Sequence, residues 1–415
     1  MKKVLVVGGG GREHAIVKAL SLSPRVDKIY CAPGNAGIAQ LAECIGIKDT
    51  DCEALRDFAL KEGIDLTVVG PEAALAAGIA DVFREAGLPI FGHSKAATRI
   101  ESSKDFAKRL MFKYGIPTSG YKTFTDYEAA LQYVESRPLP AVLKYDGLAA
   151  GKGVVIAETM DEARFALRDM LLDGHYSEGR VVIEDYLSGP EFSFLCFVNG
   201  SDIYPMPLSQ DHKRAFDGDR GPNTGGMGAY TGLPFINEED KAFALKEIMQ
   251  KTADAMCAGG TPLSGVLYGG LMKTPDGIKV IDFNARFGDP ETEVVLPLLK
   301  SDIYDIFEAV ALSKPLGQAP RWTDEVSAGV VLASKGYPGS YEKGFSIECP
   351  AEGVYHMGTA LSEGKLVTSG GRVLICTATA SNIEEAVRKA YEKASEVKCD
   401  NLFMRSDIAW QALKK

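Results

Sequence analysis

The first 100 residues alternate short apolar runs with longer amphipathic stretches. The apolar runs predict buried strands, at 3–8, 28–32, 65–70 and 88–92. The stretches between them have helical periodicity and predict helices, at 14–22, 52–63 and 75–86. Strand–helix alternation with short joints is typical of a parallel sheet that helices cover on both faces. We therefore predict an N-terminal parallel α/β domain at 1–101.

The pattern changes between residues 102 and 325, which we take as a second domain. Here strands are predicted at 140–145, 153–157, 180–189 and 191–200, and helices at 103–115 and 161–172. Two apolar stretches within 264–291 predict a hairpin, because Pro275, Asp276 and Gly277 between them are typical turn residues. The remainder, 326–415, indicates a small α+β domain with strands at 327–334, 355–361 and 372–380 and a helix at 382–395.

Composition and charge restrict the function. The chain of 415 residues has 46 Lys and Arg against 56 Asp and Glu, a formal net charge of −10. This acidic balance argues against nucleic acid or an anionic membrane as a partner. No apolar run approaches the roughly 20 residues that span a bilayer. Gly8 to Gly11 end the first apolar run too early for a signal peptide, so we expect a cytoplasmic protein.

Cysteine and histidine usage bears on compartment and metal. The eight cysteines form no CxxC pair, which is typical of reduced thiols in the cytoplasm. The five histidines form no HxH or HExxH cluster, which argues against zinc. A metal would then be held by carboxylate and amide oxygens, which suit Mg²⁺ or Mn²⁺.

Three glycine-rich loops follow predicted strands of the first domain, with the sequences GGGGREH, APGNAG and GPEAAL. Ligands of open parallel sheets bind beyond the carboxyl ends of the strands, so this edge is a candidate small-ligand site. The first loop fails the dinucleotide fingerprint, because Glu13 or His14 stands where the third glycine is needed. Its backbone N–H groups before a helix can hold a phosphate, and a tight turn without a ligand is the alternative.

A further glycine-rich loop, Gly147 to Gly153, joins two predicted strands. It is not a Walker A motif, because it is one residue too short and Gly153 stands where Ser or Thr is needed. Lys144 on the incoming strand can reach phosphate oxygens. We expect the loop to be a mobile lid over a nucleotide, since a lid excludes water and still opens.

The strand VIDFNAR carries the strongest chemical signal. Side chains of a strand alternate, so Asp282, Asn284 and Arg286 should share one face. Ile281, Phe283 and Ala285 should then face the core. An acid and an amide two residues apart suit Mg²⁺ that bridges nucleotide phosphates, and an arginine beside them can clamp a carboxylate or a phosphate. A surface edge strand with a salt bridge is the alternative, and Asp289 and Glu291, which follow closely, argue against it.

Weaker signals lie between these motifs. Glu184-Asp185-Tyr186-Leu187 ends a strand and could present backbone groups to an adenine, and Glu191 could bind a ribose hydroxyl. Each could equally be an ordinary polar residue with local partners. His212 stands out among the histidines, because it lies in the polar run from Asp211 to Arg214.

Together these segments resemble one known family. The helix that opens with SKDFAK, the glycine lid, the EDYL segment and the acid–x–Asn strand form the pattern of the ATP-grasp superfamily. The loops quoted above, with QDHKRAFDGDRGPNTGGMGAY and NARFGDPETE, closely resemble the phosphoribosylamine–glycine ligase family, from Lys3 to the C-terminal MRSDIAW. The resemblance implies a parallel N-terminal domain, an ATP-grasp core with a mobile lid subdomain at about 119–190, and a small C-terminal domain.

The resemblance also implies an activity. Such ligases join glycine to 5-phosphoribosylamine in an early step of purine synthesis, through a glycyl phosphate formed with ATP. The implied partners are these small molecules and Mg²⁺ or Mn²⁺, with no nucleic acid or membrane, and the implied state is a monomer or weak dimer. Another ATP-grasp ligase or carboxylase of purine metabolism, and a nucleotide sensor without turnover, are the alternatives.

Site residues are carried over by motif. Those implied to bind ATP are Lys104, Lys144, Gly147, Gly151, Lys152, Gly153, Glu184, Asp185, Tyr186, Leu187 and Glu191. Those implied to bind the other substrates are Gly10, Gly11, Asn35, Gly37, Pro71, Glu72, Asp211, Gly225, Gly226 and Arg286. The implied metal ligands are Asp282 and Asn284, and the implied catalytic residues are Arg286, Asp211 and Lys144.

Two positions depart from the family pattern. The metal-strand acid is usually Glu, and Asp282 is one methylene shorter, which bears on the choice between Mg²⁺ and Mn²⁺. The C-terminal motif usually reads YRxDIG, whereas this chain has MRSDIA.

Overall fold

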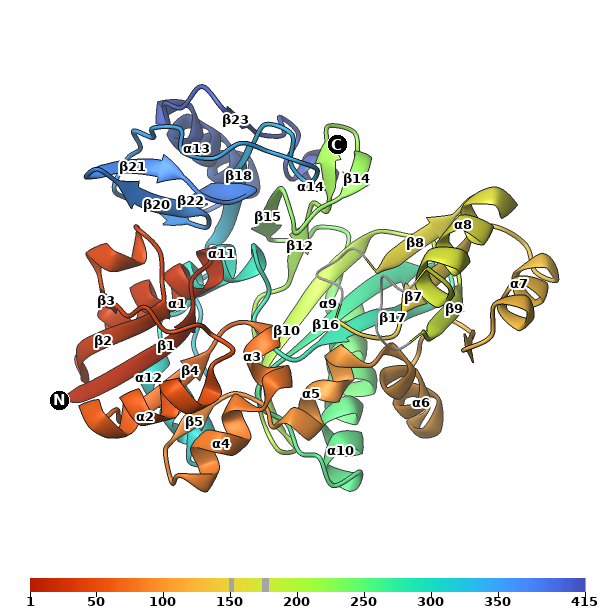
Figure 1. The fold of residues 1–415 in the computed structure, drawn as a ribbon, viewed down its shortest axis with the longest axis horizontal. Coiled ribbons are helices and arrows are strands. Elements are labelled where there is room, and N and C mark those ends of the chain that lie inside the picture. Colours follow the sequence, from red (N-terminus) through yellow and green to blue (C-terminus); the bar gives the residue numbers. More distant parts are fainter. Residues whose placement is uncertain (149–152, 174–178, 415) are drawn as a thin grey trace.

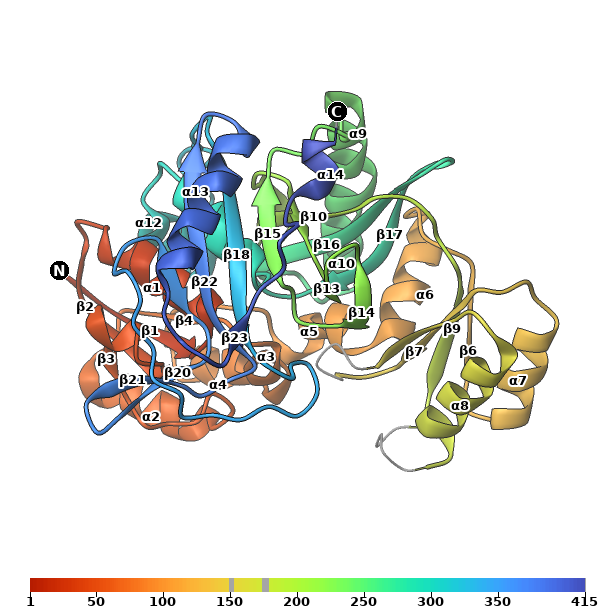
Figure 2. The ribbon, with the colours of Figure 1, turned by 90° about the horizontal axis from the view of Figure 1, so that it is seen from above.

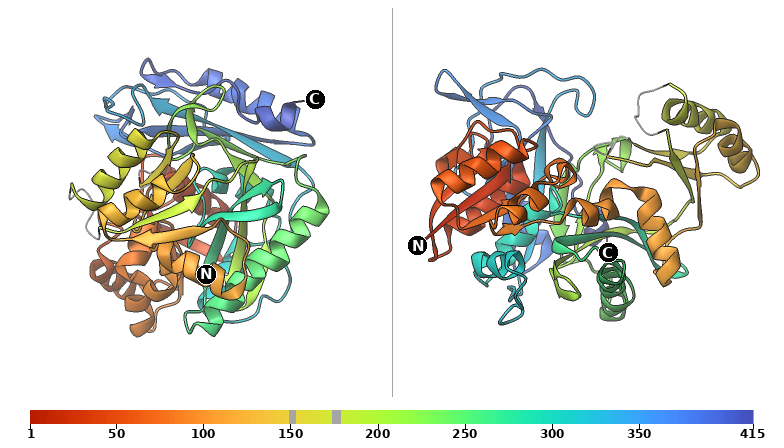
Figure 3. Two further views of the ribbon diagram at one scale, coloured as in Figure 1. Left: turned by 90° about the vertical axis from the view of Figure 1, so that its right-hand side faces the viewer. Right: turned by 60° about the horizontal axis from the view of Figure 1, so that its bottom comes forward.

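The computed structural model describes residues 1–148, 153–173 and 179–414. An N-terminal sheet lies at one end, a small sheet with two helices projects at the other, and a large sheet runs between them (Figure 1). The view from above and the right-hand view of Figure 3 show the same separation (Figures 2 and 3). Within the described ranges, no helix is both long and apolar enough to cross a membrane.

The N-terminal sheet is parallel, as predicted, with its five strands in the order β3-β2-β1-β4-β5. The strands are β1 (Lys2–Gly8), β2 (Val26–Pro33), β3 (Glu43–Cys44), β4 (Leu66–Val69) and β5 (Ile90–Phe91). The helices are α1 (Gly11–Ser21), η1 (Ile38–Gln40), α2 (Cys52–Glu62), α3 (Glu72–Ala77), α4 (Ile79–Glu85) and α5 (Lys95–Ser102). The single helix predicted at 75–86 is wrong, because Gly78 has a φ of +99° and separates α3 from α4.

Alternate residues of β1 face two different cores, as the pleat of a strand requires. Leu5 and Val7 pack with apolar residues of α2, α3 and α4. Val4 and Val6 belong to a second core that includes Phe197 of the central sheet. The N-terminal sheet is therefore joined to the rest of the molecule through a buried apolar face, which holds its loops in a fixed position.

The central sheet has ten strands, which pair antiparallel. Its main path is β17-β16-β10-β12-β15-β18-β22-β19, with β11 beside β10 and β23 beside β18. The strands are β10 (Glu191–Asn199), β11 (Asp202–Pro205), β12 (Ser209–Asp211), β15 (Gly228–Thr231), β16 (Ser264–Thr274), β17 (Gly277–Asn284), β18 (Val326–Ser334), β19 (Val354–His356), β22 (Arg372–Ala380) and β23 (Leu402–Phe403). The C-terminal α+β region thus continues the central sheet through the β15–β18 pair.

A small sheet stands apart, with the order β6-β9-β7-β8 and its own apolar core. It consists of β6 (Tyr121–Phe124), β7 (Ala141–Tyr145), β8 (Val154–Ala157) and β9 (Val181–Asp185), covered by α7 (Tyr127–Glu135) and α8 (Met160–Leu171). Gly151 and Lys152 of the expected lid lie outside the described residues.

The remaining elements connect these sheets. Two short hairpins are β13 (Arg214–Phe216) with β14 (Arg220–Asn223), and β20 (Thr359–Ser362) with β21 (Lys365–Thr368). The helices are α6 (Lys104–Tyr114), α9 (Glu238–Phe243), η2 (Ala244–Gln250), α10 (Lys251–Ala258), α11 (Glu291–Val295), η3 (Leu296–Leu298), α12 (Ile303–Ala311), α13 (Ile383–Glu396) and α14 (Trp410–Leu413). The helical stretch from α9 to α10 and helix α12 were not among the predicted elements.

Strand β17 corrects one prediction. Gly270 of β16 pairs with Asp282 and Leu271 pairs with Val280, so Ile281 is an extra, bulged residue. The bulge places Val280 rather than Ile281 in the core with Phe283 and Ala285. It also frees the Ile281 carbonyl from the ladder, and Lys144 Nζ donates to it at 2.8 Å. The predicted core face is therefore wrong at Ile281 alone.

Candidate active site

The end of β17 meets the loops that follow β1 and β4. Arg286, two residues beyond β17, has Nε 3.3 Å from Oε2 of Glu72, which opens α3 after β4 and Pro71. Its Nη2 lies 3.1 Å from Glu101 Oε1 and 3.2 Å from Asn284 Oδ1. Arg12, in the first turn of α1, donates to the same Phe287 carbonyl as Arg286, each at 3.2 Å. Two buried guanidinium groups thus converge where a phosphate or carboxylate can bind.

The pKa values of the two acidic partners of Arg286 shift in opposite directions. Burial acts to raise the pKa of Glu72, but attraction to Arg286 and Arg12 outweighs it, so the pKa falls below its usual value. Burial raises the pKa of Glu101, and attraction to Arg286 only partly opposes that shift. Glu101 also accepts a hydrogen bond from the Ala285 N–H at 2.7 Å, so it fixes the chain at the end of β17.

The first glycine loop is already capped by the protein itself. The Gly10 N–H donates to Oε2 of Glu13 at 2.6 Å, so this donor is taken by the carboxylate at the start of α1. A side chain at Gly9 would approach the Gly34 carbonyl to 2.6 Å, so the β1 and β2 loops touch. Gly11 faces the buried Glu293. The structure therefore places Gly10 and Gly11 beside Arg12, with one N–H already occupied.

Asn35 braces the second loop. Its Nδ2 donates to the carbonyls of Gly9 and His356 at 2.9 and 2.8 Å, and its Oδ1 accepts from Gly37 N and Ile38 N. These four bonds use both donors and both acceptor positions of the amide. Asn35 and Gly37 thus shape the edge of the site through backbone contacts that lead to the C-terminal region.

The predicted metal ligands lie on one face of β17. Asp282 Oδ2 is 3.7 Å from Nζ of Lys104, the first residue of α6, whose N-cap is Ser103. Burial acts to raise the pKa of Asp282, but attraction to Lys104, Lys213 and Lys144 outweighs it and lowers the pKa. A side chain at Gly270 on the paired strand would collide with Asp282 Oδ1, so this glycine gives the carboxylate its space.

Lys144 and Glu184 form a buried ion cluster under this face. Nζ of Lys144 lies 2.9 Å from Glu184 Oε1, and Nζ of Lys108 lies 2.9 Å from Oε2. Ser119 Oγ donates to the same Oε2 at 2.9 Å. Burial acts to raise the pKa of Glu184, but both lysines outweigh it and lower the pKa. Burial lowers the pKa of Lys108 to about 8. The Glu184 carboxylate is therefore engaged by the protein, and Lys144 ties the small sheet to β17.

The other residues expected around ATP are more open. Asp185 ends β9 and pairs with Arg137 at 2.7 Å, and Tyr186 beside it is 46% exposed. Leu187 follows, partly exposed. Glu191 Oε2 is 2.8 Å from Nζ of Lys213. Gly147 lies against the Tyr145 ring, and the Gly153 carbonyl accepts from Tyr145 N.

Asp211 lies in a cluster of buried acids that the sequence did not reveal. Its Oδ1 is buried with no hydrogen-bond partner among the described residues, and a side chain at Gly226 would collide with it. Burial and the nearby Glu291 raise its pKa well above the usual value. Glu291 Oε1 accepts from Ser193 Oγ at 2.9 Å and Tyr268 Oη at 2.6 Å.

Arg372 links Gly225 and Asp289 beside this acidic cluster. Its Nη1 donates to the carbonyls of Gly225 and Asp289 at 2.7 and 2.9 Å and lies 2.8 Å from Asp289 Oδ1. Glu293, two residues after Glu291 in α11, is 0% exposed, and neither of its oxygens has a hydrogen-bond partner in the described part of the chain. Burial and the nearby Asp289 raise its pKa well above the usual value, and its carboxylate lies against Gly11.

Several of these residues escaped the sequence reasoning. Lys108 and Glu101 are buried charges whose ionic partners, Glu184 and Arg286, are distant in the chain. Arg12 and Arg372 likewise contact distant residues, at the Phe287 carbonyl and at Asp289. Glu293 is buried without a hydrogen-bond partner among the described residues. A charged residue within an apolar helical stretch, such as Lys108 in FAKRLMF, was the one available signal.

Comparison with known families agrees with this geometry. Three models of phosphoribosylglycinamide synthetase match the chain in succession: the N domain over 2–101, the ATP-grasp (A) domain over 102–292 and the C domain over 327–411. The chain belongs to the phosphoribosylglycinamide synthetase family. The family identified from the sequence motifs is thus confirmed, and so is the α/β fold class with an ATP-grasp core.

Relatives of this family match over nearly their whole length. A phosphoribosylamine–glycine ligase of Halalkalibacterium halodurans is 49% identical, covering 99% of this chain and 97% of its own. A phosphoribosylamine–glycine ligase of Streptococcus pneumoniae is 47% identical, and the match covers 99% of this chain and 100% of the relative. The crystal structure of a phosphoribosylamine–glycine ligase from Thermotoga maritima has a TM-score of 0.85 at 34% identity, over 98% and 100%. A biotin carboxylase from Campylobacter jejuni has the same fold, with a TM-score of 0.75 at 14% identity, over 97% and 93%.

Proposed function

We propose that the protein joins glycine to 5-phosphoribosylamine with ATP, giving glycinamide ribonucleotide, ADP and phosphate. The observation that carries this is the meeting of β17 with the glycine loops, where Arg286 links Asn284 to Glu72. Phosphate-binding and carboxylate-binding groups lie there side by side. Full-length similarity to ligases of this name supports the choice of substrates.

The chemistry explains why such groups are needed together. A carboxylate is a poor acyl donor to an amine, because its leaving group would be oxide. Transfer of the γ-phosphoryl group of ATP to glycine gives glycyl phosphate, whose leaving group is phosphate. Positive charges hold the transferring phosphoryl group by position and electrostatics. The amine of phosphoribosylamine then attacks the acyl carbon and releases phosphate.

We assign the nucleotide to the side chains where the small sheet meets β17. Lys104 and Lys144 would face its phosphates, and the open Asp185–Leu187 segment would lie along the base. Glu191 would serve the ribose. Gly147, Gly151, Lys152 and Gly153 would cover the phosphates. Glu184 then acts by holding Lys144 and Lys108 in place rather than by touching ATP.

The donor set on β17 fits a hard divalent cation. The Asp282 carboxylate accepts no hydrogen bond from the described residues, and the Asn284 amide oxygen lies beside it along the strand. Mg²⁺ takes one or two protein oxygens and completes its shell with phosphates and water. Asp282 and Asn284 would hold Mg²⁺ or Mn²⁺, which supplies neutralising charge to the ATP phosphates.

The other two substrates belong on the side of the N-terminal loops. Arg286 would clamp the glycine carboxylate, and later the acyl phosphate, while Asp211 faces the glycine amine with Gly225 and Gly226 beside it. Arg12, Gly10 and Gly11 would meet the phosphate of phosphoribosylamine. Asn35, Gly37, Pro71 and Glu72 would form the wall of this pocket. A division at 1–101, 102–325 and 326–415, a cytoplasmic location, and a monomer or weak dimer stay predictions.

The test is ADP release with each substrate omitted in turn. We expect ADP only when ATP, glycine, phosphoribosylamine and Mg²⁺ are all present, and none when formate or bicarbonate replaces glycine. Release with formate or bicarbonate would identify a different ligase or a carboxylase. ATP binding without ADP release under any of these conditions would identify a nucleotide sensor.

A further inference from the structure

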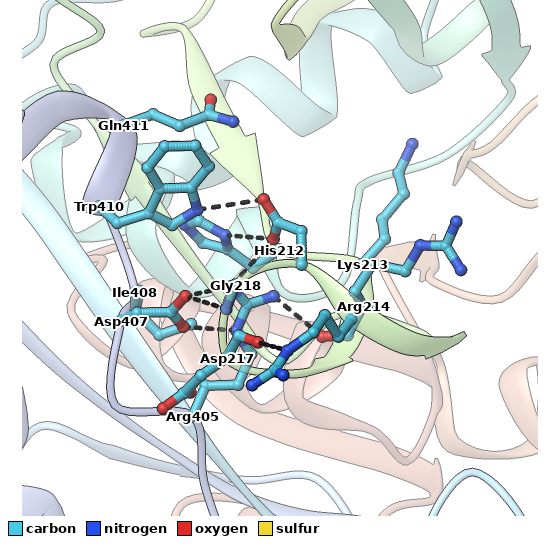
Figure 4. A network of polar contacts seen from close by, with 12 residues as sticks. His212, Lys213, Arg214, Asp217, Gly218, Arg405, Asp407, Ile408, Trp410 and Gln411 are labelled. Carbon is cyan, nitrogen blue, oxygen red and sulfur yellow. Dashed lines mark hydrogen bonds and ion pairs between the residues drawn. The ribbon is translucent and has the colours of Figure 1, made fainter.

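The C-terminal segment 405–411 packs against the β13–β14 hairpin through a network of polar contacts (Figure 4). Arg405 lies at the centre, with its side chain 0% exposed. Its Nε and Nη2 donate to the two carboxylate oxygens of Asp407 at 2.7 and 2.9 Å. Nη1 donates to the Arg214 carbonyl at 3.0 Å, and Nη2 lies 2.9 Å from Asp219 Oδ1. One guanidinium fork therefore ties this segment to a strand and the turn of the hairpin.

The turn is held from several sides. Asp219 has a φ of +52°, a conformation that side chains other than glycine rarely adopt. Its Oδ2 accepts from Trp410 Nε1 at 3.1 Å, which adds a second anchor to that of Arg405. Asp407 Oδ2 also accepts from Gly218 N at 2.8 Å, and Ser406 N donates to Asp217 Oδ1 at 2.8 Å. These contacts hold the turn from outside the hairpin, through both the chain and the side chain of Asp219.

The network ends at His212. Its Nε2 accepts from the Ala409 N–H at 2.9 Å, so this nitrogen carries no proton. The other ring nitrogen, Nδ1, then carries the hydrogen and lies 3.7 Å from Asp219 Oδ1. The ring stacks on Tyr230, with centroids 5.9 Å apart. Tail, turn and central sheet thus fix the imidazole on three sides.

The two residues that flank His212 in the chain, Asp211 and Lys213, contact residues of the proposed active site. The preceding residue, Asp211, lies beside Glu291 and Gly226. The following residue, Lys213, pairs with Glu191, and its charge helps to lower the pKa of Asp282. Figure 4 shows the Lys213 side chain extending away from the contacts around Arg405. A rotation of the chain at His212 would therefore move both neighbours at once.

We propose that Arg405 is a positioning residue for the ligase reaction, acting through Asp219 and His212 to hold Asp211 and Lys213 toward the substrates. The proposal rests on the proposed function, in which Asp211 faces the glycine amine. Arg405 itself touches no substrate in this proposal. The C-terminal MRSDIAW segment would then contribute to the reaction, although Arg405 lies 194 residues after Asp211 (405 − 211).

The test is Arg405→Lys, which keeps the charge and loses the planar fork. We expect kcat to fall about 10-fold to 100-fold, since small misplacements of reacting groups cost that much. The KM for glycine should rise through Asp211, and the KM for ATP should rise through Lys213, which pairs with Glu191. Val373→Ala is the matched control: it removes buried apolar contacts in β22, so it should lower the Tm and leave kcat and both KM values unchanged.

A readout apart from activity is the imidazole nitrogen NMR spectrum of His212, assigned by its loss in His212→Gln. Wild type should show an unprotonated Nε2, and Arg405→Lys should show a mixture of tautomers. Should Arg405→Lys fail to fold, Asp219→Asn keeps the shape of the turn and should give the same kinetic and spectral changes.

Wild-type kinetics in Arg405→Lys, an equal loss of kcat in Val373→Ala, or lost activity with an unchanged His212 spectrum would each overturn the proposal. The two proposals fail differently. Absence of ADP release by the wild-type protein would reject the ligase function. The His212 NMR spectrum would still show whether Arg405 fixes the imidazole tautomer.

Discussion

Asp282→Asn separates folding from metal-supported chemistry, because it keeps the size of the side chain and removes its charge. The described partner of Asp282 is Lys104, 3.7 Å away, and the Asp282 side chain is 28% exposed. A partly exposed ion pair of this length contributes less than about 1 kcal/mol to stability. We therefore expect the free energy of unfolding in urea to change by less than that amount.

Turnover should respond far more. The carboxylate is attracted to Lys104, Lys144 and Lys213, and it is a proposed oxygen ligand of the metal. Loss of one preorganised transition-state contact typically costs about 10²–10³-fold in turnover. The assay is coupled ADP release at saturating glycine and phosphoribosylamine, over a range of Mg²⁺ and Mn²⁺ concentrations. Partial rescue by excess Mn²⁺ would identify the shorter aspartate as a working ligand.

Asp276→Asn is the matched control on the same hairpin. Asp276 pairs with Lys279 at 3.4 Å and is 82% exposed, so its loss should change neither turnover nor metal dependence. Near wild-type turnover of Asp282→Asn at ordinary Mg²⁺, with normal folding, would refute the assignment of β17 as the metal strand.

Four further outcomes follow from single contacts. Arg286→Lys keeps the charge but loses the fork between Glu72 and Glu101, so kcat for ADP release should fall about 10²–10³-fold. Glu184→Gln leaves Lys108 and Lys144 buried without an anion and should lower the unfolding free energy in urea by about 3–5 kcal/mol, unlike a change at the exposed Glu135. His93 is satisfied as a neutral ring by Ser264 N–H and the Val266 carbonyl, and burial lowers its pKa to about 4. The unfolded chain therefore takes up this proton first as the pH falls, and urea stability is lost between about pH 6.5 and 4, with a smaller loss in His93→Gln. Ala409→Gly relieves a left-handed φ of +66° and should raise the Tm, with a gain of up to about 1 kcal/mol.

Local pattern was enough to predict the N-terminal domain and the chemical face of β17. Val4 to Val7 alternate between two cores, and the loops after such strands gather at one edge of a parallel sheet. The helix over α9–α10 escaped because no glycine loop or chemical motif marked it. Ile281 was misplaced because a bulge depends on how β16 pairs with β17, which the sequence of one strand does not contain.

The buried ion clusters could not be predicted from the sequence for the same reason. Glu184 was expected to contact ATP, but two lysines from α6 and β7 occupy its carboxylate. Arg372 and Asp289 are 83 residues apart in the chain and meet only after the C-terminal strands have joined the sheet. Such pairings depend on tertiary contacts that local sequence does not specify.

The continuity of the central sheet has a consequence for biosynthesis. Strand β15 carries its partner β18 on one side, and β18 in turn pairs with β22, which is completed only at Ala380. A nascent chain that ends near residue 325 exposes β15 as an open edge, a site for pairing with other chains. The ribosome must therefore release nearly the whole chain before the sheet closes, and a premature stop would yield an aggregating fragment rather than a partial enzyme.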